Sequence, residues 1–165
     1  MIYYCKINVP SLKRTFYIAK NKKGICYVAL HNNEKRFLKD LGNYLPDNVK
    51  RSEDRLKGEV RQILEYFAGK RKVFKLSVFL KGTNFQTKAL TELAKVRYGE
   101  TISYTELAKR TGNKNAFRAA ATVCATNPVP IIIPCQRVIA KDGSLGGFGG
   151  GLKMKRDMLT MEKAI

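Results

Sequence analysis

A cysteine at position 135 carries the strongest chemical signal in this chain. It follows Pro134 and a run of three isoleucines, and Gln136 and Arg137 come directly after it. Proline fixes its own φ and disfavours the helical region for the preceding residue, so we expect the chain to arrive extended and turn at Cys135. A thiol at the start of a helical turn lies near free backbone N–H groups, which together with Arg137 favour the reactive thiolate. The alternative for a lone cysteine is a buried structural thiol, but the surrounding residues favour a nucleophile.

The segment around this cysteine resembles the active site of the O6-alkylguanine-DNA alkyltransferases. Residues 127–138 read Asn-Pro-Val-Pro-Ile-Ile-Ile-Pro-Cys-Gln-Arg-Val, and the usual family form is Asn-Pro-x-Pro-x-x-x-Pro-Cys-His-Arg-Val. The likeness extends over residues 82–162 and includes Tyr98-Gly-Glu-x-x-Ser-Tyr104, Arg118 and Leu145-Gly-Gly-Phe-Gly-Gly-Gly151. With four segments in family order, the chain is identified as a member of this family. One letter departs, because Gln136 stands where the family has histidine.

The resemblance implies DNA repair by direct reversal, in a single irreversible turnover and without a cofactor. The alkyl group of O6-alkylguanine, and also of O4-alkylthymine, would pass to Cys135 after the damaged nucleotide is flipped out of the duplex. Tyr104 would press on the 3′ phosphate and donate a proton toward guanine N3, and Asn127 belongs to the same catalytic group. In the family the histidine, oriented by a carboxylate matching Glu162, removes the thiol proton through a water. Gln136 has no accessible pKa for that step, so the local field would have to favour the thiolate.

The resemblance also implies how the base and the duplex are held. Backbone near Val138 would accept from the guanine amine, the amide of Gly149 would donate to O6, and Phe148 stands where many relatives have tyrosine. The helix containing Arg118 would enter the minor groove, where its arginine fills the gap left by the flipped base. The full sets are Val138, Phe148, Gly149 and Pro130 for the substrate, and Arg118, Ala119, Tyr104 and Arg137 for DNA.

The glycine-rich stretch 146–151 has two interpretations from its residues alone. A phosphate cradle of the Walker type would end in Gly-Lys-Ser/Thr, and this stretch does not. A flexible pocket wall around a flat base is therefore the better interpretation.

The charge of the chain favours a polyanionic partner. Its formal net charge is +19, with 18 basic and 7 acidic residues over 1–80, and 14 and 6 over 81–165. Lysine enrichment for solubility or heat tolerance is the alternative, and the excess is not concentrated on the half that holds Cys135. Double-stranded DNA containing alkylated guanine is thus predicted from the motifs, with charge as support. No apolar stretch is long enough for a membrane span and no signal peptide is visible, so we expect a cytoplasmic monomer.

The cysteines raise the question of a metal site. Some relatives bind a structural zinc through two cysteines and two histidines, and Cys5, Cys26 and His31 fall in a similar order here. His31 is the only histidine in the chain, and structural zinc requires four ligands. We therefore expect no metal, and ordinary buried thiols or a Cys5–Cys26 disulfide remain as alternatives.

The predicted elements indicate an α+β protein with domains at 1–80 and 81–165. In the first domain, runs of β-branched and aromatic residues predict an antiparallel meander, followed by one helix and one extended segment. By resemblance this is the ribonuclease H-like domain of the family. The predicted strands are Tyr3–Val9, Thr15–Ala19 and Ile25–His31, the helix is Arg55–Ala68, and the extended segment is Val73–Leu80.

The second domain has a helical pattern, which fits a winged-helix (helix-turn-helix) DNA-binding domain. Capping boxes at Thr83-x-x-Gln86 and Ser103-x-x-Glu106 predict two helix starts, and residues 113–115 predict a third cap. Alanines favour the last helix. The predicted helices are Phe85–Val96, Tyr104–Arg110 and Ala116–Thr126.

Three other functions compete with alkyl transfer. The first is lesion binding with weak or no transfer, as in alkyltransferase-like proteins, although those replace the cysteine that this chain retains. The second is a winged-helix regulator, which would leave the Pro-Cys segment and the glycine wall unexplained. A thiol protease is disfavoured because His31, the only histidine, lies in the other predicted domain.

Overall fold

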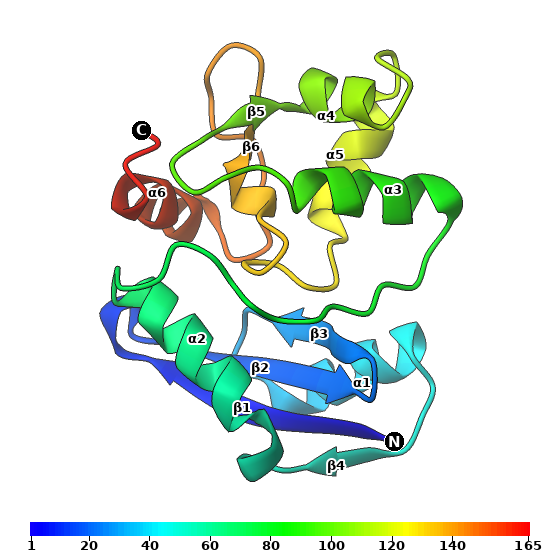
Figure 1. Ribbon diagram of the computed structural model, residues 1–165, viewed down its shortest axis with the longest axis vertical. Coiled ribbons are helices and arrows are strands. Elements are labelled where there is room, and N and C mark those ends of the chain that lie inside the picture. The colour runs from blue at the N-terminus through cyan, green and yellow to red at the C-terminus, as the bar shows by residue number, and fades with distance from the viewer. The chain divides into compact units, whose positions relative to one another are not determined.

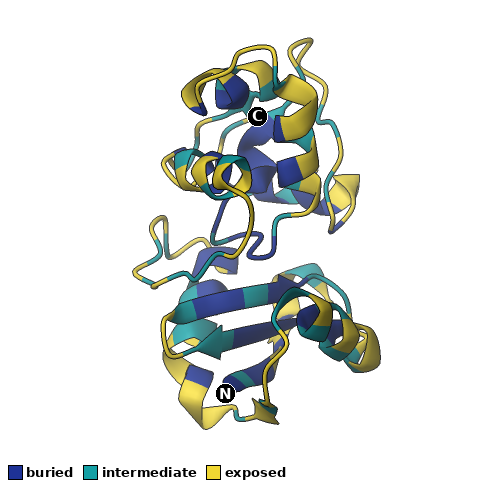
Figure 2. Ribbon diagram, turned by 90° about the vertical axis from the view of Figure 1, so that its right-hand side faces the viewer, coloured by how far each residue is buried: buried dark blue, intermediate teal, exposed yellow.

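The computed structural model describes all of residues 1–165. Contacts divide the chain into two compact units, Met1–Lys81 and Gly82–Ile165, which we call the amino-terminal and the carboxy-terminal unit. None of the helices is both long and apolar enough to cross a bilayer. Buried residues gather along the strands of the first unit and on the inner faces of the helices of both units (Figure 2). Each unit therefore has a core of its own.

A four-stranded sheet forms the centre of the amino-terminal unit (Figure 1). Strands β1, β2 and β3 form the antiparallel meander that the sequence predicted, and the short β4 adds parallel to β1, giving the order β3-β2-β1-β4. Runs of β-branched and aromatic residues predicted the first three strands, but β4, with three residues, is too short to show such a run. The strands are β1 (Ile2–Val9), β2 (Arg14–Asn21), β3 (Gly24–Ala29) and β4 (Val49–Arg51).

The two α-helices of this unit cover opposite faces of the sheet. Phe37 of α1 stacks on Tyr17, with ring centroids 5.1 Å apart, and Phe67 of α2 packs 5.9 Å from Phe16. Because Phe16 and Tyr17 are neighbours in β2, their side chains point to opposite faces. The predicted helix is present as a short 3-10 turn followed by α2, whereas α1 was not predicted. The helices are η1 (Pro10–Leu12), α1 (Glu34–Tyr44), η2 (Asp54–Leu56) and α2 (Lys57–Phe67).

The carboxy-terminal unit is mainly helical, and α4 and α5 form the expected helix-turn-helix (Figure 1). Two short parallel strands, β5 and β6, join the start of α4 to the segment after Cys135. The elements are α3 (Asn84–Leu93), β5 (Ile102–Ser103), α4 (Tyr104–Arg110), α5 (Phe117–Ala125), η3 (Cys135–Arg137), β6 (Val138–Ile139) and α6 (Leu152–Met161).

The predicted capping boxes formed to different extents. At α3 both halves are present, since Thr83 Oγ1 accepts from the Gln86 amide at 3.2 Å and Gln86 Oε1 accepts from the Thr83 amide at 2.8 Å. At α4 only Ser103 caps the helix, because Glu106 instead accepts a hydrogen bond from Arg110 at 2.9 Å. The second capping box is therefore incomplete, because the Glu106 carboxylate binds Arg110 and not the amide of Ser103.

The third predicted cap is wrong. Helix α5 begins at Phe117 after Ala116, whose side chain offers no acceptor. Asn113 Oδ1 accepts from the Asn115 amide at 3.0 Å, so it closes a local turn before the helix. Asparagine stabilises such turns as readily as helix caps, and the sequence did not distinguish the two.

Candidate functional site

Cys135 lies at a corner between an extended segment and a 3-10 turn. Pro134 precedes it with φ −82° and ψ 66°, and the turn closes through the Arg137 amide, which donates to Pro134 O at 2.9 Å. The Cys135 amide donates to Ile133 O at 2.8 Å. The residue is only 5 % exposed. The chain therefore turns at the cysteine, as the proline predicted, but into a buried environment.

The segment that delivers Cys135 is a tight loop closed by Asn127. The Asn127 side chain donates to Ile133 O at 2.9 Å and accepts from the Val129 amide at 3.0 Å. Inside this loop Ile131 is fully buried and has φ +75°, a conformation that β-branched residues rarely adopt. Pro130 is buried beside it. Such strain persists only where the surrounding structure holds it, and it gathers at functional sites.

The environment of the Cys135 thiol differs from the sequence-based expectation. Burial raises the pKa of Cys135, while a hydrogen bond with the Asn127 side chain and the charge of Lys155 act in the opposite direction. Arg137 does not contribute to lowering this pKa. Removal from water disfavours the thiolate more than the 3-10 turn and nearby groups favour it. The expectation of a thiolate favoured by Arg137 is therefore wrong.

Arg137 has a structural role that corrects a second expectation. We expected it to contact DNA, but it is 6 % exposed and forms a two-pronged ion pair with Glu162 through Nε and Nη2, at 2.9 and 3.0 Å. Its Nη1 donates to Val96 O at 2.6 Å. Glu162, expected to orient the side chain at position 136, thus holds Arg137, and it also accepts from the Gly99 amide at 3.4 Å. All three of these hydrogen bonds hold the guanidinium inside the carboxy-terminal unit.

Gln136 is completely buried within the same turn. Gln136 takes part in interactions within the protein, and its side-chain Oε1 is buried away from solvent. An amide can hydrogen-bond a water or a thiol but cannot accept a proton near neutral pH. Position 136 therefore carries no side-chain base.

Lys155 is a residue of this site that the sequence analysis missed. Its side chain is fully buried, and its Nζ donates to the carbonyls of Val138 at 2.6 Å, Gly147 at 3.3 Å, and Leu145. Burial lowers the pKa of Lys155, and the nearby Cys135 raises it. A signal was available, because Lys155 lies in α6 beside the buried Met154 and one helical turn before Met158 and Leu159. A lysine among apolar positions of a helix indicates a specific partner.

Tyr104 and the glycine-rich stretch lie together. A Cβ on Gly146, whose φ is +69°, would lie 2.6 Å from the Tyr104 hydroxyl, so the backbone can approach the phenol only without a side chain. Burial and the nearby thiols of Cys124 and Cys135 raise the pKa of Tyr104, while a hydrogen bond with the Gly147 backbone lowers it. The phenol is therefore protonated at neutral pH and available as a donor.

The remaining substrate-binding candidates differ in exposure. Val138 is fully buried and pairs with Ile102 between β5 and β6, whereas Phe148 is half-buried and Gly149 is exposed. Cys124 of α5, for which the sequence predicted no role, is half-buried close to Cys135. Burial and the adjacent Cys135 raise the pKa of Cys124 to about 12. The site therefore contains a second, protonated thiol.

The DNA-contact candidates on α5 are exposed. Arg118 and Ala119 both face solvent, and the Arg118 guanidinium lies 5.9 Å from the centre of the Phe117 ring. Phe117 is 45 % exposed, which is unusual for a large apolar residue. Ala120 and Val123 hold the opposite side of the helix in the core. An exposed face of small residues with one cation is therefore available for a partner.

The cysteines of the amino-terminal unit are separate free thiols, so the alternative of a Cys5–Cys26 disulfide is wrong. Both are buried, and Cys26 Sγ contacts Ala19 O at 3.5 Å. His31 Nδ1 accepts from the Asn33 amide at 3.3 Å. No group of three or more His, Cys, Asp or Glu side chains is placed to hold a metal ion.

Family models match almost the whole chain. Residues 2–80 match the "6-O-methylguanine DNA methyltransferase, ribonuclease-like domain", and residues 84–164 match the "6-O-methylguanine DNA methyltransferase, DNA binding domain". The chain is 37% identical to the inducible methylated-DNA–protein-cysteine methyltransferase of Bacillus subtilis, over 90% of this chain and 84% of that protein. It is 35% identical to the enzyme of that name from Methanosarcina acetivorans, over 88% and 89%.

Solved structures have the same fold. The O6-methylguanine methyltransferase of Mycobacterium tuberculosis superposes with a TM-score of 0.83 at 31% identity, covering 99% of this chain and 94% of that one. A complex of the Mycobacterium tuberculosis protein with DNA gives a TM-score of 0.84 at 30% identity, covering 98% and 93%. The predicted α+β class, with a ribonuclease-like domain followed by a DNA-binding domain, is confirmed.

Proposed function

Because this chain belongs to the methylated-DNA–protein-cysteine methyltransferase family, we propose that it repairs DNA by transferring the alkyl group of O6-alkylguanine to Cys135. Membership makes the chain a self-inactivating, single-turnover transferase that acts on DNA. What remains to be tested is which lesions it takes and which residues carry the reaction. O4-alkylthymine is the second substrate to test, because it presents an alkyl group on an equivalent exocyclic oxygen.

In the proposed reaction, Cys135 Sγ forms a bond to the alkyl carbon as the bond from that carbon to guanine O6 breaks. The electron pair of the broken bond stays on guanine, and Tyr104 supplies a proton to N3, so the leaving group is neutral. The proton of the thiol passes to solvent water before or during attack, and the Tyr104 phenolate left after transfer to N3 takes a proton back from water, so the proton count balances. Tyr104 is protonated at neutral pH and so has a proton to supply to N3, while burial raises its pKa and makes it a weaker acid than an ordinary tyrosine.

Two side chains around Cys135, those of Asn127 and Lys155, support nucleophilic attack without a histidine. Asn127 hydrogen-bonds the thiol and fixes the loop that carries it, and the charge of Lys155 favours the thiolate. Lys155 also holds the backbone at Leu145 and Gly147, where the base would lie. These residues position and stabilise the nucleophile, but none of them replaces a general base. We therefore expect slow transfer that accelerates with rising pH.

Access to the lesion requires that the nucleotide leave the base stack. We propose that α5 enters the minor groove and that Arg118 occupies the space of the extruded base. The exposure of Arg118 and of the small Ala119 supports this, since the helix backbone can approach the duplex closely at that point.

The observation that carries the proposal is the corner at Cys135, where Asn127 closes the strained loop that carries the thiol, next to Lys155, which binds the Leu145 and Gly147 carbonyls of the glycine-rich stretch. The test is intact mass after incubation with a duplex containing O6-methylguanine. We expect a gain of one methylene unit, located on Cys135 by peptide mapping. Transfer by Cys135→Ala, or modification of Cys124 in the unaltered protein, would show that another group is the acceptor.

Lesion binding without efficient transfer is a second candidate function. Two observations favour it: the pKa of Cys135 is raised by burial, and Gln136 cannot act as a base. In that case the same incubation gives a stable complex with the modified duplex and no mass gain over hours. A mass gain on Cys135 that goes to completion excludes this function.

A further inference from the structure

The amino-terminal unit contains a cavity of about 910 Å³ whose lining is strongly basic. It lies at the start of β1, between the β2–β3 turn, the beginning of α2 and the extended segment near residues 75–79. Its lining includes the aromatic residues Tyr3 and Phe79. No part of this cavity belongs to the carboxy-terminal unit, and the alkyl-transfer chemistry does not explain it.

The two acidic groups of the cavity are each neutralised within it. Glu59 forms an ion pair with Lys20 at 2.6 Å, and Asp47 pairs with the amino group of Met1 at 2.7 Å. Both partners of each pair line the cavity, so these charges cancel.

Four cations of the lining remain without a carboxylate partner, namely Lys22, Lys23, Arg55 and Lys75. Lys23 lies 5.1 Å from the centre of the Phe79 ring, and the Arg55 guanidinium lies 4.3 Å from that of Tyr3. Lys22 and Lys75 extend into solvent. Four uncompensated cations from three separate segments repel one another unless an anion lies between them. The cavity is thus complementary to a ligand with several negative charges.

We propose that this cavity binds the phosphodiester backbone of a nucleic acid, independently of base sequence and of any lesion. Both aromatic rings already have a cation over them, so the cations, and not the ring faces, meet an incoming ligand. Contacts of lysine and arginine with phosphates supply affinity and orientation but no sequence information. The site gives a function to the basic character of this unit, in which basic residues outnumber acidic ones 18 to 7 over residues 1–80.

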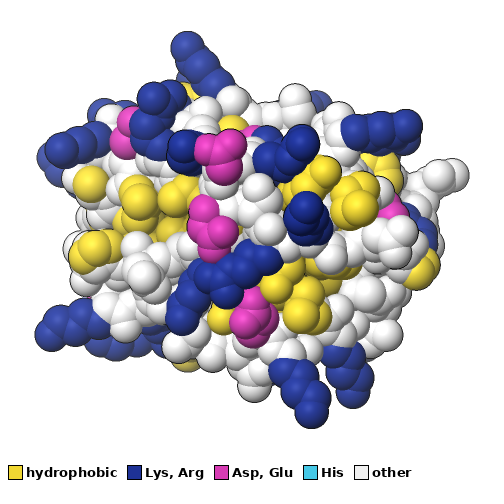
Figure 3. Space-filling view, turned by 90° about the horizontal axis from the view of Figure 1, so that it is seen from below, with side chains coloured by type: hydrophobic (Ala, Val, Ile, Leu, Met, Phe, Trp, Pro, Cys, Tyr) yellow, Lys and Arg dark blue, Asp and Glu magenta, His cyan; other side chains and the backbone are white.

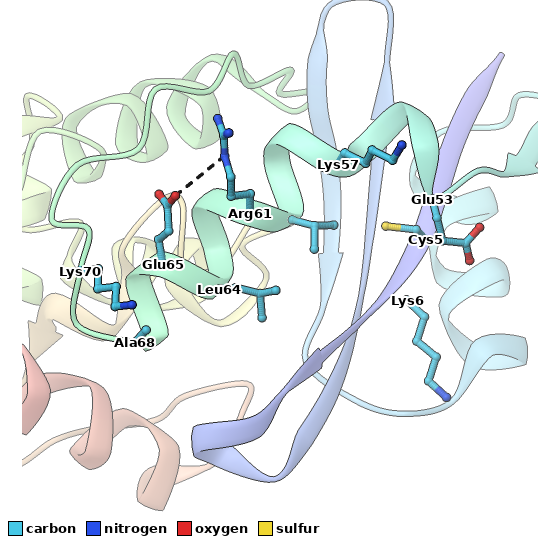
Figure 4. A pocket seen from close by; sticks show the side chains of 10 residues that line it. Cys5, Lys6, Glu53, Lys57, Arg61, Leu64, Glu65, Ala68 and Lys70 are labelled. Carbon is cyan, nitrogen blue, oxygen red and sulfur yellow. Dashed lines mark ion pairs between the residues drawn. The ribbon is translucent and has the colours of Figure 1, made fainter.

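A second cavity of the same unit also has basic residues in its lining, but it lacks the features that suit a phosphate ligand. This cavity, of about 520 Å³, lies beside Cys5 between β1 and α2 (Figure 4). Its walls are largely apolar, including Val60 and Leu64, and Arg61 and Glu65 of its rim form an ion pair. Figure 3 shows one face of the protein, seen from below, on which many basic side chains lie around apolar patches, with fewer acidic side chains among them. Of the two cavities, only the first combines aromatic rings with several cations that have no carboxylate partner.

The test measures binding of the full chain to a fluorescent duplex without a lesion over a series of KCl concentrations. The test protein has three substitutions, Lys22→Ala, Lys23→Ala and Lys75→Ala. Each lost phosphate contact lowers the slope of log K against log salt by about 0.9, so we expect the slope to fall by about 2 to 3. Reaction with free O6-benzylguanine, which needs no duplex, should not change.

The matched control removes three exposed lysines of the same unit that lie outside both cavities: Lys35→Ala, Lys39→Ala and Lys50→Ala. It has the same net charge as the test protein, and we expect its slope to change by less than about 1. Equal slopes for the two proteins would overturn the proposal, because net charge alone would then explain the effect.

A calorimetric titration with sodium triphosphate separates nucleic acid from a small polyphosphate. Tight binding of triphosphate that is lost in the Lys22/Lys23/Lys75 variant, with no effect on duplex binding, would assign the cavity to a small polyphosphate and overturn the assignment to nucleic acid. Because the duplex contains no lesion, a failure of alkyl transfer at Cys135 would leave these results unaffected.

Discussion

Replacing Arg137 by methionine tests whether this residue stabilises the fold or contacts DNA. The change removes two hydrogen bonds to Glu162 and one to Val96 O, and it leaves a carboxylate whose side chain has no solvent exposure. Breaking a buried ion pair by removing one partner costs about 3 to 5 kcal/mol. The lost bond to a backbone carbonyl adds about 1 kcal/mol or more. We therefore expect a loss of at least about 3 kcal/mol in the unfolding free energy of the carboxy-terminal unit.

The measurement must report on that unit alone, because a chain of two compact units need not unfold in one step. Hydrogen exchange of peptides from η3 and α6, followed through a urea series, provides this. With a slope of about 1 to 2 kcal/mol per molar urea, the midpoint should fall by about 1.5 M or more. The matched control is Arg156→Met, an exposed arginine of α6, which should change stability by no more than about 0.5 kcal/mol.

A double variant sharpens the test. If the cost of Arg137→Met comes from the stranded carboxylate, the further change Glu162→Met should recover part of the stability, since apolar replacements of buried pairs are often tolerated. DNA affinity, measured where both proteins are folded, should match that of the unaltered chain. A stable Arg137→Met protein with weakened DNA binding would refute this reasoning and restore Arg137 as a DNA contact.

Three further outcomes test the catalytic site. Because burial raises the pKa of Cys135, the single-turnover rate should climb as pH rises from neutral toward that pKa. The change Gln136→His should raise the rate by about tenfold or more near pH 7 and make the rate less dependent on pH. If the rate–pH profiles of the two proteins coincide, the glutamine at position 136 does not slow the reaction. Arg118→Ala should slow repair in duplex DNA much more than reaction with free O6-benzylguanine, and equal losses would assign Arg118 to the fold or the pocket. Gly146→Ala should slow both reactions, because its Cβ would lie 2.6 Å from the Tyr104 hydroxyl and alanine disfavours the positive φ at this position. Gly143→Ala is the control: φ is also positive there but nothing lies within 4 Å of the added Cβ, so its rate shows the effect of backbone strain without the contact.

Local sequence rules predicted the elements whose signals are complete within a few residues. The meander of β1 to β3 was predicted from runs of β-branched and aromatic residues, and the capped start of α3 from a four-residue motif; both are present. The cap of α5 and the acidic half of the α4 box failed because Asn113 and Glu106 found other local partners. Helix α1 was not predicted, although Asn33 caps it and Phe37 and Leu41 lie one turn apart on its buried face.

The site was predictable to the extent that its chemistry resides in one segment. The proline before Cys135 was enough to predict a turn at the thiol. The protonation of that thiol was not predictable, because it depends on burial by parts of the chain distant in sequence. The roles of Arg137 and Lys155 have the same origin, since Glu162 and the carbonyls of Val138 and Leu145 come from elsewhere in the unit. Arg137, which was expected to contact DNA, and Lys155, which had no predicted role, are both buried and hydrogen-bonded within the unit.

The three carbonyl contacts of Lys155 also determine how the chain between β6 and α6 can vary. By binding Val138, Leu145 and Gly147 at once, a single ammonium divides a long glycine-rich connection into two short closed loops, which limits the conformational entropy that the glycines would otherwise bring. The outer loop closes on itself where the Ala140 amide donates to Ser144 O, and its tip at residues 141–143 is exposed. Added residues or a fused tag at this tip should therefore leave the pocket wall in place. An insertion between 147 and 151 would instead lengthen the loop that Lys155 closes and release the wall from its anchor.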